Sequence, residues 1–361
     1  WIQRGDDIAG EALGDGTGNG TKLSADGSIL AVAAPFYDGD EGNAEDAGQV
    51  RVYRWDGESW LQRGQFIDGE AAGDLIGRYD FDLTANGSFM AVGGQGNDAS
   101  GLDAGHLRVY AWSEINQLWI QRGEDINGEA AGDRSGSLVS ISDDGSIVAV
   151  GAFLNNSSAT GFGAGHVRIY SYDNSAGWVQ RGEDIDGVAE GDFFGWSTSL
   201  SADGSRISIG AIQGALGSGM GYVEIYDWDG AAQGWIQQGQ SISGTMMADY
   251  NGWAQSLSDD GTIVATGAIG GFEQAGRIAI YRLTGVADAF PLDGTETLDT
   301  DSDGIGNNAD PDDDNDGAGD FSEIIVLREG DLSSRWDFGL LGLENDSSGN
   351  TQPCGYVVGE A

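Results

Sequence analysis

Cysteine, lysine, histidine and proline are all scarce in this chain of 361 residues. The single cysteine, Cys354, excludes an internal disulfide framework and a cysteine-rich zinc or iron–sulfur site. The 16 basic residues face 59 acidic ones, which gives a net charge of −43. A chain this acidic does not bind nucleic acid through its phosphates. No apolar run approaches the roughly 18 residues that a membrane-spanning helix needs, so we expect no membrane insertion.

Glycine, by contrast, is abundant, with 63 residues, and it marks an internal repeat. A tryptophan opens each copy in the pattern Trp-x-Gln-Arg/Gln-Gly, at Trp1, Trp60, Trp119, Trp178 and Trp235. An isoleucine, a glycine and an Asp-x-x-Gly follow each time. The Asp-x-x-Gly aspartates are Asp15, Asp74, Asp133, Asp192 and Asp249. The sequence therefore contains five copies of one structural unit.

Each copy predicts a four-stranded antiparallel meander. An Asp-Gly or Asn-Gly pair, such as Asp144-Gly145, lies between two β-rich segments and predicts a two-residue type I′ turn. In the third copy the strands read 138–142, 147–151 and 166–172, and Trp178-Val-Gln-Arg-Gly supplies a fourth. No segment has the period of an amphipathic helix. Meanders of this kind, placed side by side, build a β-propeller.

Counting strands predicts five blades within residues 1–283. Residues 249–283 hold only three strands, and Trp1–Gly5 is a strand without a blade. We therefore expect the N-terminal strand to close the last blade, because an open edge exposes unpaired backbone. Two alternatives remain open: the sequence is part of a longer chain with more blades, or Trp1–Gly5 completes the blade of a neighbouring molecule.

The repeats resemble the FG-GAP repeats of integrin-α-like β-propellers. The resemblance rests on Asp-x-x-Gly, Leu-Ser-x-Asp-Gly-Ser and Ala-Val-Gly-Ala, and it covers residues 1–283. It implies an extracellular propeller. The calcium loop of integrin blades is replaced here by Leu-Ser-Ala-Asp-Gly-Ser, which has too few oxygen ligands for calcium.

A calcium-binding segment is predicted in residues 284–323. Residues 293–323 contain two loops in which acidic residues alternate with other residues around a tight glycine turn. Ca²⁺ prefers six to eight oxygen ligands placed in this way. The stretch resembles thrombospondin type 3 repeats, which wrap around calcium ions. The expected ligands of the first loop are Asp299, Asp301, Asp303, Ile305 and Asp310, and those of the second are Asp312, Asp314, Asp316, Ala318, Asp320 and Glu323; Ile305 and Ala318 would bind through backbone carbonyls.

Catalytic signatures are missing from the sequence. There is no Gly-x-Ser-x-Gly, no His-Glu-x-x-His and no phosphate-binding loop. Both histidines, His106 and His166, occupy a repeat position that varies between copies, which indicates a blade-surface site. The Asp-x-x-Gly aspartates, with Glu11, Glu70 and Glu129, would form an acidic ring on one face. We expect the aspartates to accept hydrogen bonds from loop amides, with cation or ligand binding as the alternative.

The remaining candidates concern the surface and the C-terminal tail, 324–361. Glycosylation sequons place candidate sites at Asn19, Asn155, Asn156 and Asn345, while Asn86 lies in a tight turn. Cys354 is a candidate for an inter-subunit disulfide. Short apolar runs in the tail suggest a β-rich contact with a neighbouring subunit.

These features together predict a non-enzymatic, calcium-stabilised protein outside the cell or at its surface. We expect a structural or adhesive subunit that associates head-to-tail into a filament. The alternative is a monomeric module that binds a glycan or protein ligand through the variable loops between the second and third strands. A secreted enzyme is the third interpretation.

Overall fold

The computed structural model describes residues 1–39, 44–156, 161–213, 219–270 and 276–282, and two strands near the C-terminus. Two compact units divide the chain at residue 283. The first contains all five repeats. In the second, β24 (Leu343–Asn345) and β25 (Thr351–Pro353) form an antiparallel pair.

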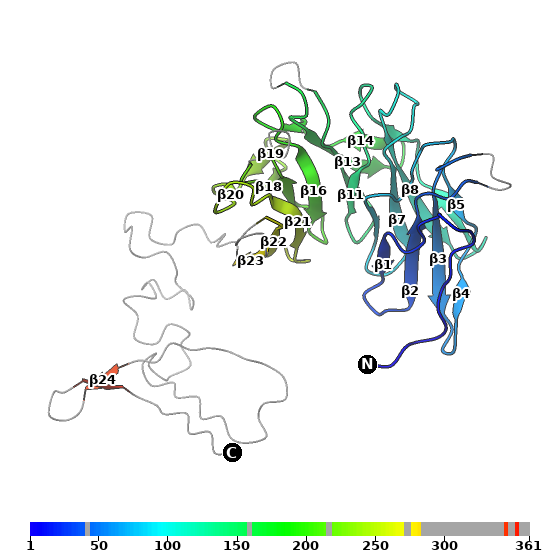
Figure 1. Cartoon of the computed structure of the whole chain (residues 1–361), viewed down its shortest axis with the longest axis horizontal. Helices are drawn as coiled ribbons and strands as arrows, with labels where there is room; N and C mark the ends of the chain where they lie inside the picture. Colours follow the sequence, from blue (N-terminus) through cyan, green and yellow to red (C-terminus); the bar gives the residue numbers. More distant parts are fainter. Residues whose placement is uncertain are drawn as a thin grey trace. The chain divides into compact units, whose positions relative to one another are not determined.

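Five antiparallel sheets, one from each repeat, make up the first unit (Figure 1). Sheet 1 contains β1 (Thr21–Leu23), β2 (Ile29–Ala34), β3 (Gln49–Trp55), β4 (Trp60–Gln62) and β5 (Ile67–Asp68). Sheet 2 contains β6 (Phe81–Leu83), β7 (Phe89–Gly94), β8 (His106–Ser113), β9 (Leu118–Gln121) and β10 (Ile126–Asn127). Sheet 3 contains β11 (Leu138–Ile141), β12 (Ile147–Ala152), β13 (His166–Asp173), β14 (Gly177–Gln180) and β15 (Ile185–Asp186).

Sheet 4 contains β16 (Phe194–Leu200), β17 (Arg206–Ala211), β18 (Tyr222–Asp229), β19 (Gly234–Gln237) and β20 (Ile242–Ser243), and sheet 5 contains β21 (Asn251–Leu257), β22 (Ile263–Ala268) and β23 (Arg277–Arg282). The all-β prediction and the meander order are confirmed for the described residues. Within them no helix is present that could cross a membrane.

In sheets 1 to 4 the fourth strand of the meander is broken in two, which the sequence pattern did not predict. In sheet 3, β13 pairs with β14 through Tyr170–Asp173 and with β15 through His166 and Val167. Sheets 1, 2 and 4 repeat this arrangement. The break places the residues between the two pieces, such as Asp184, beside the beginning of the third strand.

The turn between the first two strands also differs from the prediction. Gly27 has a φ of 68°, but Asp26 is not among the residues with positive φ. Gly27 N donates to the Ser24 carbonyl, and the Asp26 carboxylate accepts from Ser28 N. The loop is therefore a type I turn followed by a left-handed glycine, rather than type I′. Aspartate suits it because its side chain satisfies a loop amide.

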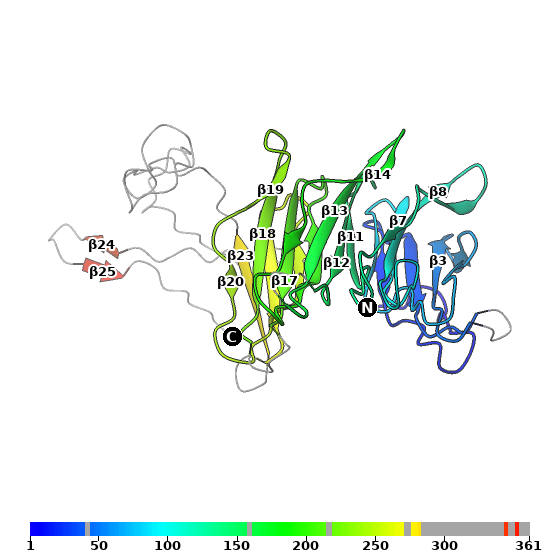
Figure 2. The same ribbon diagram turned by 90° about the horizontal axis from the view of Figure 1, so that it is seen from above.

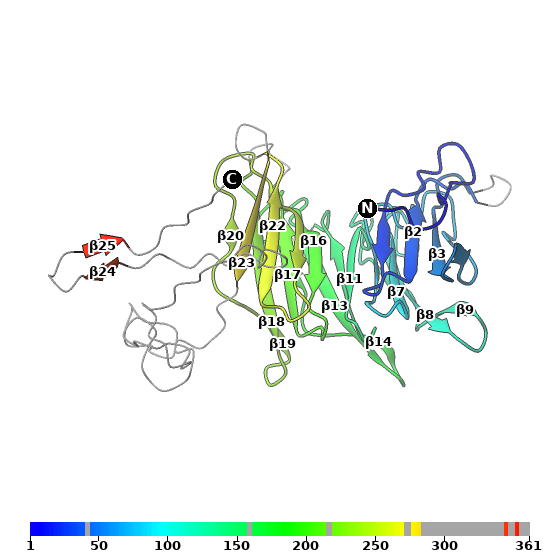
Figure 3. The same ribbon diagram turned by 90° about the horizontal axis from the view of Figure 1, so that it is seen from below.

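The sheets stand side by side in chain order (Figures 2 and 3). Their inner strands touch in succession: β1 contacts β6, β6 contacts β11, β11 contacts β16 and β16 contacts β21. Apolar cores fill the space between neighbouring sheets. Val50 and Val52 of sheet 1, for example, share a buried cluster with Phe81 and Met90 of sheet 2.

An arginine clamp joins one sheet to the next. Arg63, which follows β4, lies 4.4 Å from the centroid of the Trp112 ring of sheet 2 and donates to the Gly87 carbonyl at 2.7 Å. The Trp119 indole donates to the Arg63 carbonyl at 3.0 Å. The same three contacts recur at Arg4, Arg122 and Arg181. This clamp gives the Trp-x-Gln-Arg-Gly motif its structural role.

Trp1–Gly5 does not form a strand in this structure, contrary to prediction. Arg4 instead clamps sheet 1, with its guanidinium 4.5 Å from the Trp55 ring centroid. Sheet 5 has three strands, and Ile278 and Ile280 of β23 are 77% and 72% exposed. Their counterparts in sheet 2, Leu107 and Val109, are 0% and 1% exposed because sheet 3 covers them.

Candidate functional site

The Asp-x-x-Gly aspartates are buried, and each accepts hydrogen bonds from amides of its own loop. The Asp74 carboxylate accepts from Glu70 N and Ala71 N, and Asp192 accepts from Val188 N and Ala189 N. Asp15, Asp133 and Asp249 do the same. The expected loop-capping role is confirmed, and these residues do not form an exposed acidic ring.

The two histidines are buried, so the prediction of a blade-surface site is wrong. His106 begins β8 and is 0% exposed, and His166 begins β13 and is 1% exposed. Each follows a glycine with positive φ, Gly105 or Gly165, that turns the chain into the strand. The close approach of Gly94 to the His106 ring shows how tightly the site is packed. Variation at this position therefore reflects different buried partners rather than exposure.

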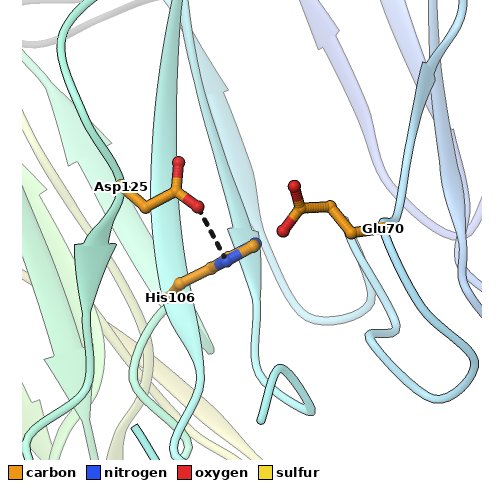
Figure 4. Close-up of side chains that lie close together, drawn as sticks. All are labelled: Glu70, His106 and Asp125. Atoms are coloured by element: carbon orange, nitrogen blue, oxygen red, sulfur yellow. Dashed lines mark ion pairs between the residues drawn. The ribbon is translucent and has the colours of Figure 1, made fainter. Parts of the chain in front are cut away.

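In sheet 2, His106 lies between two carboxylates (Figure 4). Its Nδ1 is 3.7 Å from Asp125 Oδ2. One ring nitrogen, one Asp125 oxygen and one Glu70 oxygen all lie within 4.8 Å of one another. Neither ring nitrogen has a hydrogen-bond partner within the described residues. Burial and the neighbouring Arg108 lower the pKa of His106, so the ring is neutral with a free lone pair.

Arg108 neutralises both carboxylates of this cluster. Its Nε and Nη2 donate to the two Asp125 oxygens at 3.0 and 2.9 Å, and Nη2 also contacts Glu70. Hydrogen bonds to the guanidinium lower the pKa of Asp125 against the opposing effect of desolvation.

Sheet 3 contains the equivalent cluster of Glu129, His166 and Asp184 with a different arginine geometry. His166 Nδ1 is 3.7 Å from Asp184 Oδ2, 3.9 Å from Glu129 Oε2 and 4.0 Å from Asp186 Oδ1. Arg168 donates to the Asn127 carbonyl and lies 3.6 Å from Glu129, and it forms no ion pair with Asp184 within the described residues. More negative charge is left uncompensated here, and desolvation together with Asp184 and Asp133 raises the pKa of Glu129.

His166 Nε2 has no hydrogen-bond partner in the described part of the chain. Burial, with Arg168 as a second cause, lowers the pKa of His166 and keeps the imidazole neutral. A buried neutral imidazole beside three carboxylates has the donor set that a divalent metal ion would satisfy.

Only sheets 2 and 3 combine the glutamate, histidine, arginine and aspartate that make up these clusters. The histidine position is occupied by Gln49, Tyr222 and Arg277 elsewhere, and each has its own polar contact. Gln49 donates to Asp68, the Tyr222 hydroxyl donates to Asp192, and Arg277 pairs with Asp249. The sequence signal that reveals the cluster is the joint occurrence of Glu, His-x-Arg and Glu-Asp-Ile within one repeat.

The other predicted sites fall in different places. The calcium segment 293–323 and Cys354 lie outside the described residues. Asn19 and Asn156 are exposed, whereas Asn155 is 8% exposed and its amide donates to Asp133. Asn345 ends β24.

No protein-family model and no curated protein sequence matches the chain. Solved structures with a similar arrangement include "a putative 6-phosphogluconolactonase" from Bacteroides uniformis, with 12% identity over 63% of this chain and a TM-score of 0.40. A second one with the same description, from Bacteroides fragilis, has 11% identity over 65% of the chain and a TM-score of 0.41. The chain spans 55% of the length of each.

These neighbours correct the prediction of a non-enzymatic structural or adhesive protein, because both are described as enzymes. We therefore drop two predictions: that the protein has an adhesive role, and that it is not an enzyme. The low TM-scores carry no argument about activity, and lactone hydrolysis is not assigned to this chain.

Proposed function

We propose that this protein binds a divalent transition-metal ion, with zinc as the best fit, at Glu129, His166 and Asp184. The observation that carries the proposal is the buried, neutral imidazole of His166: its Nδ1 lies 3.7 to 4.0 Å from three carboxylates, and its Nε2 has no hydrogen-bond partner in the described residues. Imidazole nitrogen and carboxylate oxygen are both zinc ligands, and three protein ligands leave one position for water. A net charge of −43 also favours cation binding.

The three ligand atoms need to move only slightly closer together to hold the ion. The three ligand atoms lie within 4.8 Å of one another. Ligands of a tetrahedral zinc ion are separated by roughly 3.3 Å, which follows from zinc–ligand distances near 2 Å. Side-chain rotation of the exposed Glu129 can close the difference. In sheet 2 the ion would have to displace Arg108 from Asp125, so we expect that site to be much weaker.

Titration calorimetry with Zn²⁺, in excess Ca²⁺ to saturate oxygen-only sites, tests the proposal. We expect a tight zinc site that His166→Gln abolishes and His106→Gln retains. Glutamine is a suitable replacement because Gln49 occupies this position in sheet 1. Absorption of bound Co²⁺ provides a second readout of nitrogen ligation. Zinc binding that is unchanged in His166→Gln, or no binding in the unaltered protein, would refute the proposal.

The proposal extends to the complete fold and to calcium. Five successive sheets, the first four of them held by the arginine clamp, support a five-bladed β-propeller, in which Trp1–Gly5 would complete sheet 5 and sheet 1 would cover Ile278 and Ile280. If so, deleting Trp1–Gly5 should destabilise sheet 5 as well as sheet 1.

Calcium binding by 293–323 suits an extracellular location, where weak calcium sites are filled.

A further inference from the structure

A pocket of about 330 Å³ opens among the innermost strands of sheets 2 to 5. Tyr79 stands two residues before β6, Leu138 begins β11, Trp196 lies in β16 and Trp253 lies in β21. All four follow the glycine of Asp-x-x-Gly by one or two residues. Four repeats thus direct a residue of the same short segment toward one cavity, which the metal proposal does not use.

Aromatic rings form the wall of this pocket. Trp196 is central: its ring centroid lies 4.9 Å from that of Phe153, 5.0 Å from Trp253 and 6.4 Å from Tyr79. Phe153 is buried, but Tyr79 and Trp253 are 46% and 40% exposed. Half-exposed large aromatic side chains gathered at one cavity are typical of a binding site.

The polar groups of the pocket are held in place by neighbours. The Asp80 carboxylate is 3.2 Å from the amine of Lys22, the only lysine of the chain. Gln255 is fixed at both ends of its amide: the nitrogen donates to the Ser208 carbonyl at 2.9 Å, and the oxygen accepts from the Ser208 hydroxyl. Carboxylate and amide groups at the edge of an aromatic wall can bind the hydroxyl groups of a ligand.

Two features narrow the chemistry of the ligand. The pocket rings Tyr79, Phe153 and Trp253 are tilted by 46° to 66° to the Trp196 ring, so they form no slot of parallel faces for a flat aromatic molecule. Lys22 compensates Asp80, and the Arg78 guanidinium lies 5.4 Å from the Tyr79 ring centroid. Lys22 also lies 3.5 Å from Asp82, so Lys22 and Arg78 balance the two carboxylates, and no excess negative charge of the described residues is left at the pocket to attract a cationic ligand.

We propose that this pocket binds a neutral sugar ring of an oligosaccharide. A pyranose has a C–H face that packs on Trp253 and Tyr79, and hydroxyl edges that reach Asp80 and Gln255. Such a ligand needs no net charge and tolerates tilted aromatic faces. The pocket is separate from the Glu129–His166–Asp184 cluster in its lining residues, so the two proposals stand independently.

Calorimetry with cellohexaose, maltohexaose, mannohexaose and galactotetraose tests the assignment, with adenosine and tetramethylammonium as probes of the other chemistries. We expect saturable binding of at least one oligosaccharide. Trp253→Ala and Tyr79→Ala should each weaken it by about tenfold or more, as for a lost aromatic anchor. Both side chains are half exposed, so the fold should tolerate these changes, and circular dichroism verifies this.

The matched control is Phe162→Ala, which removes a 57% exposed ring outside the pocket. It should leave oligosaccharide affinity unchanged. The assignment is overturned if none of the four oligosaccharides binds, or if both pocket variants bind as tightly as the unaltered protein. Binding of adenosine or tetramethylammonium that the pocket variants abolish, without sugar binding, would assign the pocket to that other chemistry.

Discussion

The arginine clamp is a side-chain interaction that recurs between neighbouring parts of the repeat unit. At each of four positions an arginine lies over an aromatic ring of the sheet it clamps and donates to the carbonyl of that sheet's turn glycine. Gln238 replaces the arginine before sheet 5, where Arg206 donates to Gly261 instead. The clamp therefore combines a cation–π contact with a hydrogen bond to buried backbone.

Arg63→Ala should lower the free energy of unfolding by about 2 kcal/mol, the sum of a partly buried cation–π contact and a hydrogen bond. The Arg63 guanidinium is 4.4 Å from Trp112. Urea denaturation of the two proteins measures the change. Gln238→Ala is the control, with an expected change below about 0.5 kcal/mol because the Gln238 side chain donates only to the Ile236 carbonyl of its own segment. Equal effects of both variants would contradict the role of the clamp.

Asp80 should stabilise the folded protein more at low pH than at neutral pH. Desolvation raises its pKa to about 6, although Lys22 acts in the opposite direction. The folded state therefore binds this proton more tightly than the unfolded state. The stabilisation is complete below the unfolded pKa near 3.8 and is lost as the pH rises through 6.

We expect the stability of the unaltered protein, relative to Asp80→Asn, to rise by about 1–2 kcal/mol between pH 7 and pH 4, after discounting for partial exposure of the carboxylate. Urea denaturation of both proteins at pH 7, 5.5 and 4 measures this difference. Comparing the two proteins cancels the titration of the other acids. Parallel pH profiles would show that Asp80 has an ordinary pKa in the folded protein.

At the scale of the strands and loops, crowding fixes the glycine that directly follows the fifth strand of a sheet, as after β10 and β15. A Cβ at Gly128 would lie 2.0 Å from the Ala104 carbonyl oxygen, and one at Gly187 would lie 2.1 Å from that of Ala164. Gly128 N also donates to the Gly105 carbonyl. The loop thus packs against the turn that introduces the histidine strand.

Gly128→Ala should cost about 2–3 kcal/mol, because backbone cannot move away as a flexible side chain would. Gly234→Ala is the matched control: no atom lies within 4 Å of its added Cβ. Its effect should stay within about 0.5 kcal/mol. Thermal unfolding of both variants measures the contrast, and a tolerated Gly128→Ala would show that the loop can shift.

At the scale of the whole molecule, the chain divides into a repeat unit ending at Leu283 and a second unit that begins at Thr284. The predicted calcium ligands all belong to the second unit. The cores of the repeat unit consist of apolar side chains and hydrogen-bonded aspartates. Removal of calcium should therefore affect the second unit alone.

Treatment with EGTA should accelerate cleavage by the protease Glu-C at Glu296 and Glu323 and leave the repeat unit intact. Mass spectrometry of the fragments over time measures this effect. Asp312→Asn with Asp314→Asn should mimic chelation in the presence of calcium, since both remove ligands of the second loop. Cleavage rates that do not depend on calcium would contradict the calcium assignment.

The sequence by itself determined the repeats, their antiparallel meanders and the loop-capping aspartates. These features depend on contacts between residues close in the chain, such as Asp74 with Glu70 and Ala71, so local patterns reveal them. Tertiary structure alone decided the rest. His106 is buried by packing against Gly94, and the clamp and the aromatic pocket join residues from different repeats. Periodicity within one repeat cannot show which side chains neighbouring repeats bring together, because that depends on how whole sheets stack.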